Sequence, residues 1–422
     1  MLNRKNKLMC YLLILVSLMF FNFSVAAEEN VKIGLIYPMT GAIATVGGHA
    51  KDAAELAVDI VNGEYPDLGF DLAPTAGLPN LGGAKIETII GNSQGQPEFG
   101  RAEAERLITI SKVSALLGCY QSSVTKTASQ VAERYKTPFV TGISTAPELT
   151  ERGFKYFFRT TLTDAIFADN FMTFFEDLNK EKGANVKNIG MFYENTEFGV
   201  ATLEASEKAA EKHGFNFVSK VKFPFGSAEL DSEVSILKQD QPDFVLSSVM
   251  ISDLILYIKT AKTVDYNVAG MAGFGGGFME PELVETLGED ANYFMTRDVF
   301  SLDLIDKIPL LGEVNKMYKD RYGVNFDGNS IRAFVGMMVL ADAINRAGST
   351  DKEAIRQALT ETDIPADQLI VAWKGVKFDE KGQNLLGQGI VRQILDGELK
   401  TVWPFELASA DIVFPMPKWN ER

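Results

Sequence analysis

Three loops of the chain carry hydroxyls, backbone amides and glycines that could hold a small ligand. They span residues 38–48, 118–125 and 142–149, and each directly follows an apolar, strand-like run. In an open α/β sheet, ligands bind beyond the carboxyl ends of the strands, where such loops lie. Helix capping by Ser or Thr explains any one of the hydroxyl-bearing loops equally well. Two of them after consecutive strands favour a ligand site.

The second loop has the chemistry to hold a carboxylate. It places the hydroxyls of Ser122 and Ser123 at the start of a predicted helix. Helix N-termini present unpaired N–H groups and the positive end of the helix dipole, and both favour anions. The third loop adds the hydroxyls of Ser144 and Thr145, and the glycines of the first loop allow close backbone approach. We therefore predict that these loops recognise an anionic group.

Three enzymatic alternatives are weaker. Segment 91–95 fits G-x-S-x-G with Ser93 at its centre, but two residues separate it from the helix that a nucleophile elbow needs at once. Only His213 follows as a candidate base. The two histidines leave little for a metal site, and the glycine run 273–277 is not a dinucleotide fingerprint. We predict no catalysis, no cofactor and no metal.

The elements that would position these loops come in two successive series. Apolar strands alternate with helices up to residue 159, and the same rhythm restarts after it. Continuous apolar strands between helices are typical of parallel sheets covered on both faces. The pattern predicts an α/β fold with two doubly wound parallel-sheet lobes. A Pro- and Gly-rich insertion at 64–83 is interpreted as a surface loop.

Length and charge agree with this organisation. The 422 residues exceed what one hydrophobic core usually serves, so two lobes are expected. The formal net charge of −15 disfavours binding to nucleic acid or to anionic membranes. Cys119, at the end of an apolar strand, is predicted to be a buried free thiol.

The N-terminus has the pattern of a cleaved export signal. Basic residues at 4–7 precede an apolar run at 8–23, and small residues follow at 24–27. The apolar run is shorter than the roughly 20 residues of a membrane-spanning helix. We therefore predict a signal peptide at 1–27, and Cys10 would leave with it.

The chain resembles the type I periplasmic binding proteins of the branched-chain amino-acid (leucine/isoleucine/valine-binding) ABC transporter family. The residues that carry the resemblance are 39–41, Gly47, 122–125, 144–153, 157–160 and Asp164. The resemblance implies two lobes joined by a three-segment hinge. Lobe one would comprise 28–163 and 299–388, and lobe two 164–298 and 389–422. It also implies a periplasmic receptor whose partners are an ABC permease and its ATPase.

The resemblance also implies roles for individual residues. Ser122, Thr145 and the backbone of Ile143 would hold a ligand carboxylate, and Phe198 would cover the ligand. Val46 stands where the leucine-type pattern has an aromatic residue. The glycine run 273–277 stands where that pattern has a glutamate for the ligand's ammonium.

This missing carboxylate leaves the ligand class open. A buried ammonium without an anionic partner is costly. Asp164 and Asp253 could replace the glutamate, although each suits the start of a helix equally well. An apolar pocket of Val46, Phe198, Met250 and Phe274 would also accept an aromatic or other amine-free carboxylate. The predicted site comprises Val46, Gln121, Ser122, Ser123, Ile143, Ser144, Thr145, Asp164, Phe198, Met250 and Phe274.

The predicted function is capture of a small hydrophobic amino acid, or a related small carboxylate, between two lobes for an ABC importer. Two alternatives stay open. One is a receptor for aromatic or other carboxylates without an amine. The other is a ligand sensor of the same fold that is not coupled to transport.

Overall fold

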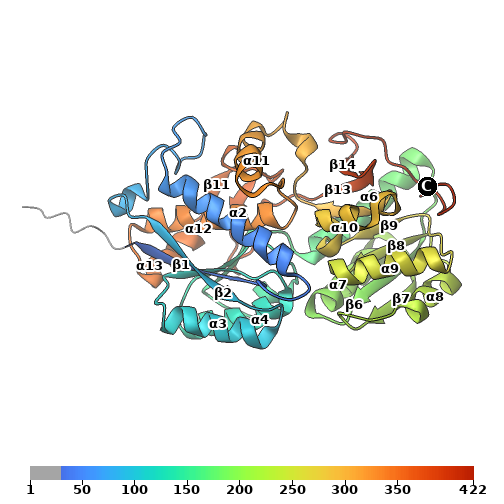
Figure 1. Ribbon diagram of the computed structural model, residues 1–422, viewed down its shortest axis with the longest axis horizontal. Helices are drawn as coiled ribbons and strands as arrows, with labels where there is room; N and C mark the ends of the chain where they lie inside the picture. The colour runs from blue at the N-terminus through green and yellow to red at the C-terminus, as the bar shows by residue number, and fades with distance from the viewer. Residues whose placement is uncertain (1–29) are drawn as a thin grey trace, which may run out of the picture.

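The computed structural model describes residues 30–422, which form two α/β lobes lying side by side (Figure 1). The predicted two-lobed α/β fold is confirmed. The predicted signal peptide at 1–27 and Cys10 lie outside the described residues. Within 30–422, no helix has the length and apolar character needed to cross a membrane.

The first lobe is built on a five-stranded parallel sheet in the order β2-β1-β3-β4-β5. Apart from the edge strand β2, its strands are almost entirely buried because helices cover both faces, which explains their continuous apolar sequences. The strands are β1 (Val31–Tyr37), β2 (Ile86–Asn92), β3 (Ala115–Gly118), β4 (Phe139–Thr141) and β5 (Phe157–Arg159). The intervening helices are α2 (Ala44–Asn62), α3 (Pro97–Thr109), α4 (Ser122–Arg134) and α5 (Glu148–Glu151).

The second lobe is built on a seven-stranded sheet in the order β14-β13-β10-β9-β8-β6-β7. Its strands are β6 (Asn188–Glu194), β7 (Asn216–Phe223), β8 (Phe244–Ser248), β9 (Met271–Gly273), β10 (Met295–Asp298), β13 (Ile390–Leu395) and β14 (Glu398–Trp403). Its helices are α6 (Asp164–Lys182), α7 (Glu197–His213), α8 (Asp231–Asp240), α9 (Ile251–Thr263) and α10 (Pro281–Leu287). The 3₁₀ turns η2 (Gly276–Met279) and η3 (Gly288–Ala291) flank α10.

This second sheet is mixed, whereas the sequence predicts a parallel one. The strands β6 to β10 pair in parallel, but β13 runs antiparallel to β10 and β14 antiparallel to β13. The two residues between β13 and β14 explain why β14 runs antiparallel to β13. Asp396 and Gly397 both have positive φ, at 51° and 75°, as a tight type I′ hairpin requires.

The chain passes between the two sheets three times. It crosses after β5, returns after β10 and crosses again before β13. Between the last two crossings it adds helices and a small strand pair to lobe one. These elements are η4 (Leu302–Leu304), α11 (Pro309–Tyr322), α12 (Ser330–Ala347), α13 (Lys352–Thr360), β11 (Asp363–Pro365), η5 (Ala366–Gln368) and β12 (Gly375–Lys377). The predicted lobe boundaries stay a prediction.

The insertion at 64–83 is not the plain surface loop that the sequence analysis expects. It contains the 3₁₀ turn η1 (Pro79–Leu81), and six of its apolar side chains are buried: Leu68, Phe70, Leu72, Ala73, Leu78 and Leu81. The ring of Phe70 lies 6.0 Å, between centroids, from that of Phe334 in α12. The insertion therefore covers α12 and extends the core of lobe one.

Candidate functional site

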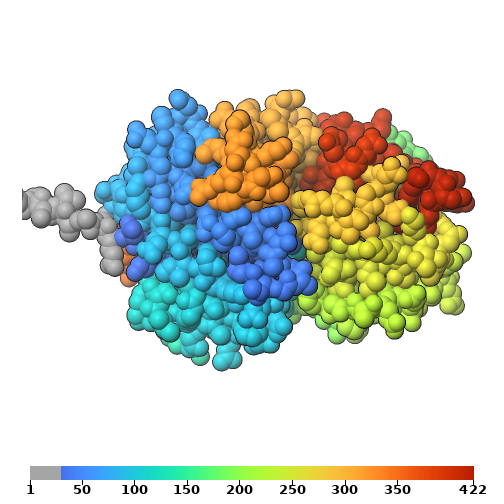
Figure 2. Space-filling model, viewed as in Figure 1, coloured from blue at the N-terminus to red at the C-terminus, as the bar shows by residue number. Residues whose placement is uncertain are grey.

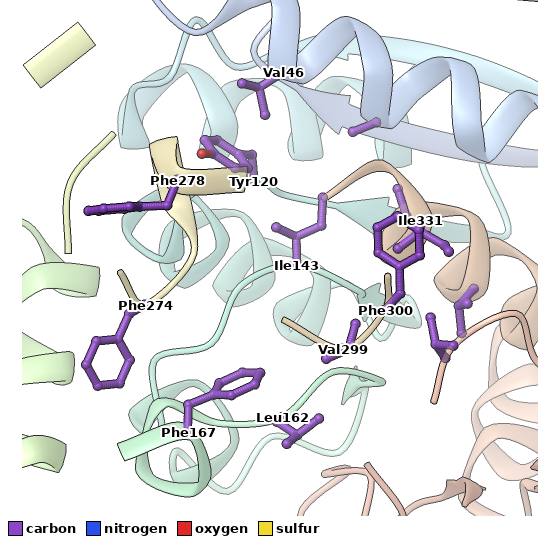
Figure 3. Close-up of a cluster of buried hydrophobic side chains, with 14 of the residues drawn as sticks. Val46, Tyr120, Ile143, Leu162, Phe167, Phe274, Phe278, Val299, Phe300 and Ile331 are labelled. Carbon is purple, nitrogen blue, oxygen red and sulfur yellow. The ribbon is translucent and has the colours of Figure 1, made fainter. Parts of the chain in front are cut away.

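A small cavity of about 20 Å³, with room for about one water molecule, lies between the lobes. Its residues follow the carboxyl ends of β3, β4, β6, β8 and β9, lie at the end of β10, or begin α12, as expected for a ligand site in α/β sheets. The wall comprises Tyr120, Gln121, Ser122, Ile143, Ser144, Thr145, Phe198, Met250, Phe274, Gly276, Arg297, Asn329 and Arg332. Figure 3 shows three of these residues, Tyr120, Ile143 and Phe274, within the surrounding buried cluster.

Most of the predicted site residues come together on this wall. They are Gln121, Ser122, Ile143, Ser144, Thr145, Phe198, Met250 and Phe274. Those from lobe one follow adjacent strands β3 and β4, whose carboxyl ends meet at one edge of the sheet. Those from lobe two follow β6, β8 and β9. The structure thus joins hydroxyl-bearing loops of one lobe to apolar side chains of the other.

The start of α4 gives the lobe-one side its anion-binding character. Gln121 occupies the N-cap position, but no side chain caps the helix within the described structure. The hydroxyl of Ser122 accepts only a long bond, 3.4 Å, from the amide of Ala146. Ser144 differs, because its hydroxyl lies 2.6 Å from that of Thr125 and donates to the carbonyl of Cys119 at 3.1 Å. Ser144 therefore ties the two loops together, while Ser122 keeps bonding capacity.

The predicted buried thiol at Cys119 is confirmed. Burial raises the pKa of this thiol to about 12. At neutral pH it is therefore protonated, which suits a packing residue rather than a nucleophile.

The lobe-two side is apolar and closely packed. The backbone amide of Met250 donates to the buried carboxylate of Glu194 at the end of β6, which fixes the loop after β8. The hydroxyl of Tyr120 donates to the sulfur of Met250 at 3.2 Å across the two lobes. Phe198 and Phe274 complete this surface, and both are buried. An apolar ligand body would contact these side chains.

Three predicted site residues do not line the cavity. Val46 lies in the first turn of α2 within the core, and Figure 3 places it on the far side of Tyr120 from Phe274. Ser123 is the second residue of α4 and lies off the wall. Asp164 is buried behind the wall, where one carboxylate oxygen lies 3.9 Å from a guanidinium nitrogen of Arg297.

Asp164 and Asp253 have different environments. Asp164 is not the N-cap of α6, because Thr163 occupies that position. Neither oxygen of Asp164 has a hydrogen-bond partner within the described residues, and burial raises its pKa to about 6. Asp253 accepts bonds from the amides of Gly226 and Ser227 at 2.8 and 3.0 Å, so it orders that loop instead.

The sequence analysis missed two arginines on the wall, Arg297 at the end of β10 and Arg332 in the first turn of α12. It also missed the wall residues Tyr120, Gly276 and Asn329. Arg332 carried a usable signal, because it is a charged residue beside the apolar run 333–341 of a buried helix. Long charged side chains are rarely buried without a partner. No local sequence pattern indicated that Arg297 would lie beside Arg332.

Direct contacts join the lobes around the cavity. Asn329 donates to the carboxylate of Glu280 at 2.6 Å, and Lys126 of α4 pairs with Glu197 of α7 at 3.2 Å. His49, Asp327 and Glu280 meet at the same seam, where blue residues of α2 lie against gold-coloured residues near α10 in Figure 2. The structure is therefore a closed arrangement of the two lobes.

The residues of the hydrolase alternative lie apart and have other partners. The amide of Ser93 bonds to the carbonyl of Tyr37 in lobe one. The ring nitrogens of His213 bond to Glu176 and Asp169 in lobe two, at 2.9 and 3.1 Å. The helix after Ser93 begins only at Pro97. This geometry does not form a nucleophile–base pair.

Comparisons with known proteins agree with the fold. The periplasmic binding protein family matches residues 30–396. A relative from Brucella suis, described as a Leu/Ile/Val-binding protein homolog, is 28% identical over 396 residues, which cover 92% of this chain and 95% of the relative.

Two solved structures share the fold. A leucine binding protein from Thermotoga maritima has a TM-score of 0.75 at 22% identity, covering 88% of this chain and 97% of the other. A solute binding protein of an ABC transporter from Rhodopseudomonas palustris, in complex with 3,4-dihydroxybenzoic acid, has a TM-score of 0.73 at 19% identity, covering 94% and 100%. With a family match that spans most of its length, the chain belongs to the periplasmic binding protein family.

Proposed function

We propose that this protein captures a small carboxylate that lacks an amine, and that it does so as the solute-binding component of an ABC importer. The observation that carries the proposal is the composition of the cavity wall. The hydroxyls of Ser122 and Thr145 share the wall with apolar side chains of lobe two, and the only charged side chains on the wall are Arg297 and Arg332. Such a wall suits an anion with an apolar body.

An ammonium group would lack an anionic partner on this wall. The family resemblance places a glutamate for the ammonium within segment 273–277. There, a Cβ added at Gly275 would lie 3.2 Å from the guanidinium carbon of Arg297. A cationic side chain therefore stands next to the position at which an anionic one would be expected. An amine brought there would be both desolvated and repelled.

A second candidate ligand class is an α-amino acid, and Asp164 favours it. Both oxygens of Asp164 are buried without hydrogen-bond partners among the described residues. An ammonium could satisfy them if the loop at Thr145 shifted. This class agrees with the names of the relatives, and the ligand screen below separates the two.

Ligand binding would shift an open–closed equilibrium, because only the closed form contacts the ligand from both lobes. The closed form would dock on a membrane permease served by an ATPase, in the periplasm after removal of residues 1–27. The lobes would divide at 163/164, 298/299 and 388/389. A sensor that does not feed transport would use the same closure, and importer genes beside this one would favour transport.

A thermal-shift screen of the mature protein against amino acids and small organic acids tests the proposal. A ligand that binds only the folded form raises the unfolding midpoint. We expect shifts with amine-free acids and none with amino acids. Shifts with amino acids alone would overturn the proposal in favour of Asp164 as the ammonium partner.

Removing either hydroxyl from the lobe-one side should weaken binding. Ser122→Ala and Thr145→Ala each leave a ligand carboxylate oxygen without a donor, so we expect a loss of about 1–3 kcal/mol in binding free energy. Calorimetric titration measures it. Ser123→Ala is the matched control, because this neighbouring serine lies off the wall and should keep wild-type affinity. Unchanged affinity in both Ser122→Ala and Thr145→Ala would contradict the proposed carboxylate position.

A further inference from the structure

Two arginines are buried together on the wall of the cavity. The side chain of Arg297 is 3% exposed and that of Arg332 is 1% exposed. Arg297 comes from β10 of lobe two, whereas Arg332 comes from α12 of lobe one. Burial, followed by the neighbouring Arg332 guanidinium, lowers the pKa of Arg297 to about 9, so Arg297 is still charged at neutral pH. Two like charges in a dry site are costly unless anions compensate them.

Arg297 has free donors. Its Nε and Nη1 have no hydrogen-bond partner within residues 30–422, and the carboxylate of Asp164, its only ion-pair partner there, is 3.9 Å away. The ring of Phe167 lies 3.8 Å from the guanidinium carbon, measured to the ring centroid, and stacking of this kind orients the guanidinium plane. An oriented guanidinium with unused N–H groups therefore borders the cavity.

Arg332 is satisfied by neutral acceptors only. Its Nε donates to the carbonyl of Gly328 at 2.6 Å, and its Nη2 donates to the side-chain oxygen of Asn329 at 2.7 Å. Its Nη1 reaches the carbonyl of Ile143 at 3.3 Å. These bonds hold the side chain in place but do not neutralise its charge.

The acids around the two arginines are engaged elsewhere. Asp298 accepts a bond of 2.6 Å from Arg392. Asp327 accepts from the amides of Asn329 and Ser330, at 2.7 and 2.8 Å, and so begins helix α12. Glu280 accepts from the side chain of Asn329. Asp298 and Asp327 therefore contribute negative charge near the pair without binding it, and among the described residues Asp164 is the one carboxylate within ion-pair distance of Arg297.

We infer that the ligand carries a second anionic group, which Arg297 binds with the support of Arg332, and that the ligand class is therefore short dicarboxylates. This inference rests on the proposed function, because it takes the first carboxylate to lie at Ser122 and Thr145. A guanidinium presents a planar set of donors that matches a carboxylate. A second carboxylate would satisfy the free donors of Arg297 and compensate the buried charge.

The test compares each dicarboxylate with its own monomethyl ester by calorimetric titration of the mature protein. Succinate, glutarate and adipate cover the short chain lengths, and each ester keeps the length and one charge while removing the other. The diacid of the best-fitting length should bind about 10- to 100-fold more tightly than its ester, as for loss of a charged hydrogen-bond partner. Equal affinity of diacid and ester would overturn the inference and leave the proposed function intact.

Substitutions of Arg297 test whether this residue causes the preference for the diacid over its ester. Arg297→Met keeps the length of the side chain and removes its donors, so the diacid and the ester should bind equally. Arg297→Lys keeps the charge and loses the planar donor set, so part of the preference for the diacid should remain. This variant replaces Arg297→Met in the test if the methionine variant fails to fold. Arg321→Met, at an exposed arginine on α11 that pairs with Asp59, is the matched control and should keep the full preference.

Two outcomes separate the inference from the proposed function. A diacid preference that survives in Arg297→Met would overturn the assignment to Arg297. Binding of amino acids together with failure of every amine-free acid, diacid or ester, would overturn both, because the site would then require the amine that the proposed function excludes.

Discussion

Replacing Gly142 by alanine is expected to lower the free energy of unfolding by about 3 kcal/mol and to weaken ligand binding. Gly142 follows β4, and the backbone of α12 passes directly over it. A Cβ at this position would lie 2.2 Å from the carbonyl oxygen of Arg332, a distance that no packing allows. The start of α12 must move away, and it carries both Asn329 and Arg332 of the cavity wall. Urea unfolding and calorimetric titration measure the two effects.

A second glycine gives the matched control. Gly48 lies within α2, and a Cβ there would meet no atom within 4 Å. Because alanine is the better helix former, Gly48→Ala should raise the free energy of unfolding by about 0.5–1 kcal/mol. Wild-type stability and affinity in Gly142→Ala would show that α12 does not rest on the β4 loop.

Replacing Asp164 by asparagine is expected to raise the free energy of unfolding relative to wild type by an amount that grows with pH. The difference should reach about 3 kcal/mol. Burial raises the pKa of Asp164 from 3.8 to about 6, although the guanidinium of Arg297, the nearby side chain of Thr145 and the guanidinium groups of Arg159 and Arg332 act in the opposite direction. A raised pKa means that the folded state holds the proton more tightly than the unfolded state. A shift of about two pKa units corresponds to about 3 kcal/mol.

The sign of this pH dependence follows from whether the folded or the unfolded state ionises first as the pH rises. Below pH 3.8 the side chain is neutral in both states, so wild type and Asp164→Asn should differ little. As the pH rises toward about 6, the unfolded wild type ionises first and the folded protein loses stability. The variant cannot ionise at this position. Urea unfolding between about pH 4 and pH 7 should therefore favour the variant progressively, and a constant difference across this range would contradict the buried ionisable Asp164.

The sequence was informative wherever a site residue sits in a local strand–loop–helix unit. Ser122 and Thr145 follow short apolar strands, so their position at the carboxyl edge of a sheet follows from pattern alone. Phe198 could be placed through the family resemblance, because the helix that carries it keeps the same position after a strand. The antiparallel direction of β14 had a usable signal that the sequence analysis did not use, because Asp396-Gly397 is a strong hairpin sequence.

The arginines of the wall required information that local patterns do not hold. Arg332 reaches the cavity because α12 packs on Gly142, a contact between residues far apart in the chain. Arg297 approaches Arg332 only because the chain returns to lobe one after β10. The burial of the insertion at 64–83 depends in the same way on α12, which Phe70 covers. Long-range packing of this one helix therefore determines most of what the sequence analysis missed.

The most direct test of the account is calorimetric titration of acids matched with and without an α-amine. The pairs are leucine with 4-methylpentanoate, phenylalanine with 3-phenylpropionate, and glutamate with glutarate. Because the cavity wall carries two arginines and no acid, the amine-free member of any pair that binds should be tighter by about tenfold or more. Tighter binding of the amino acid in such a pair would contradict the account.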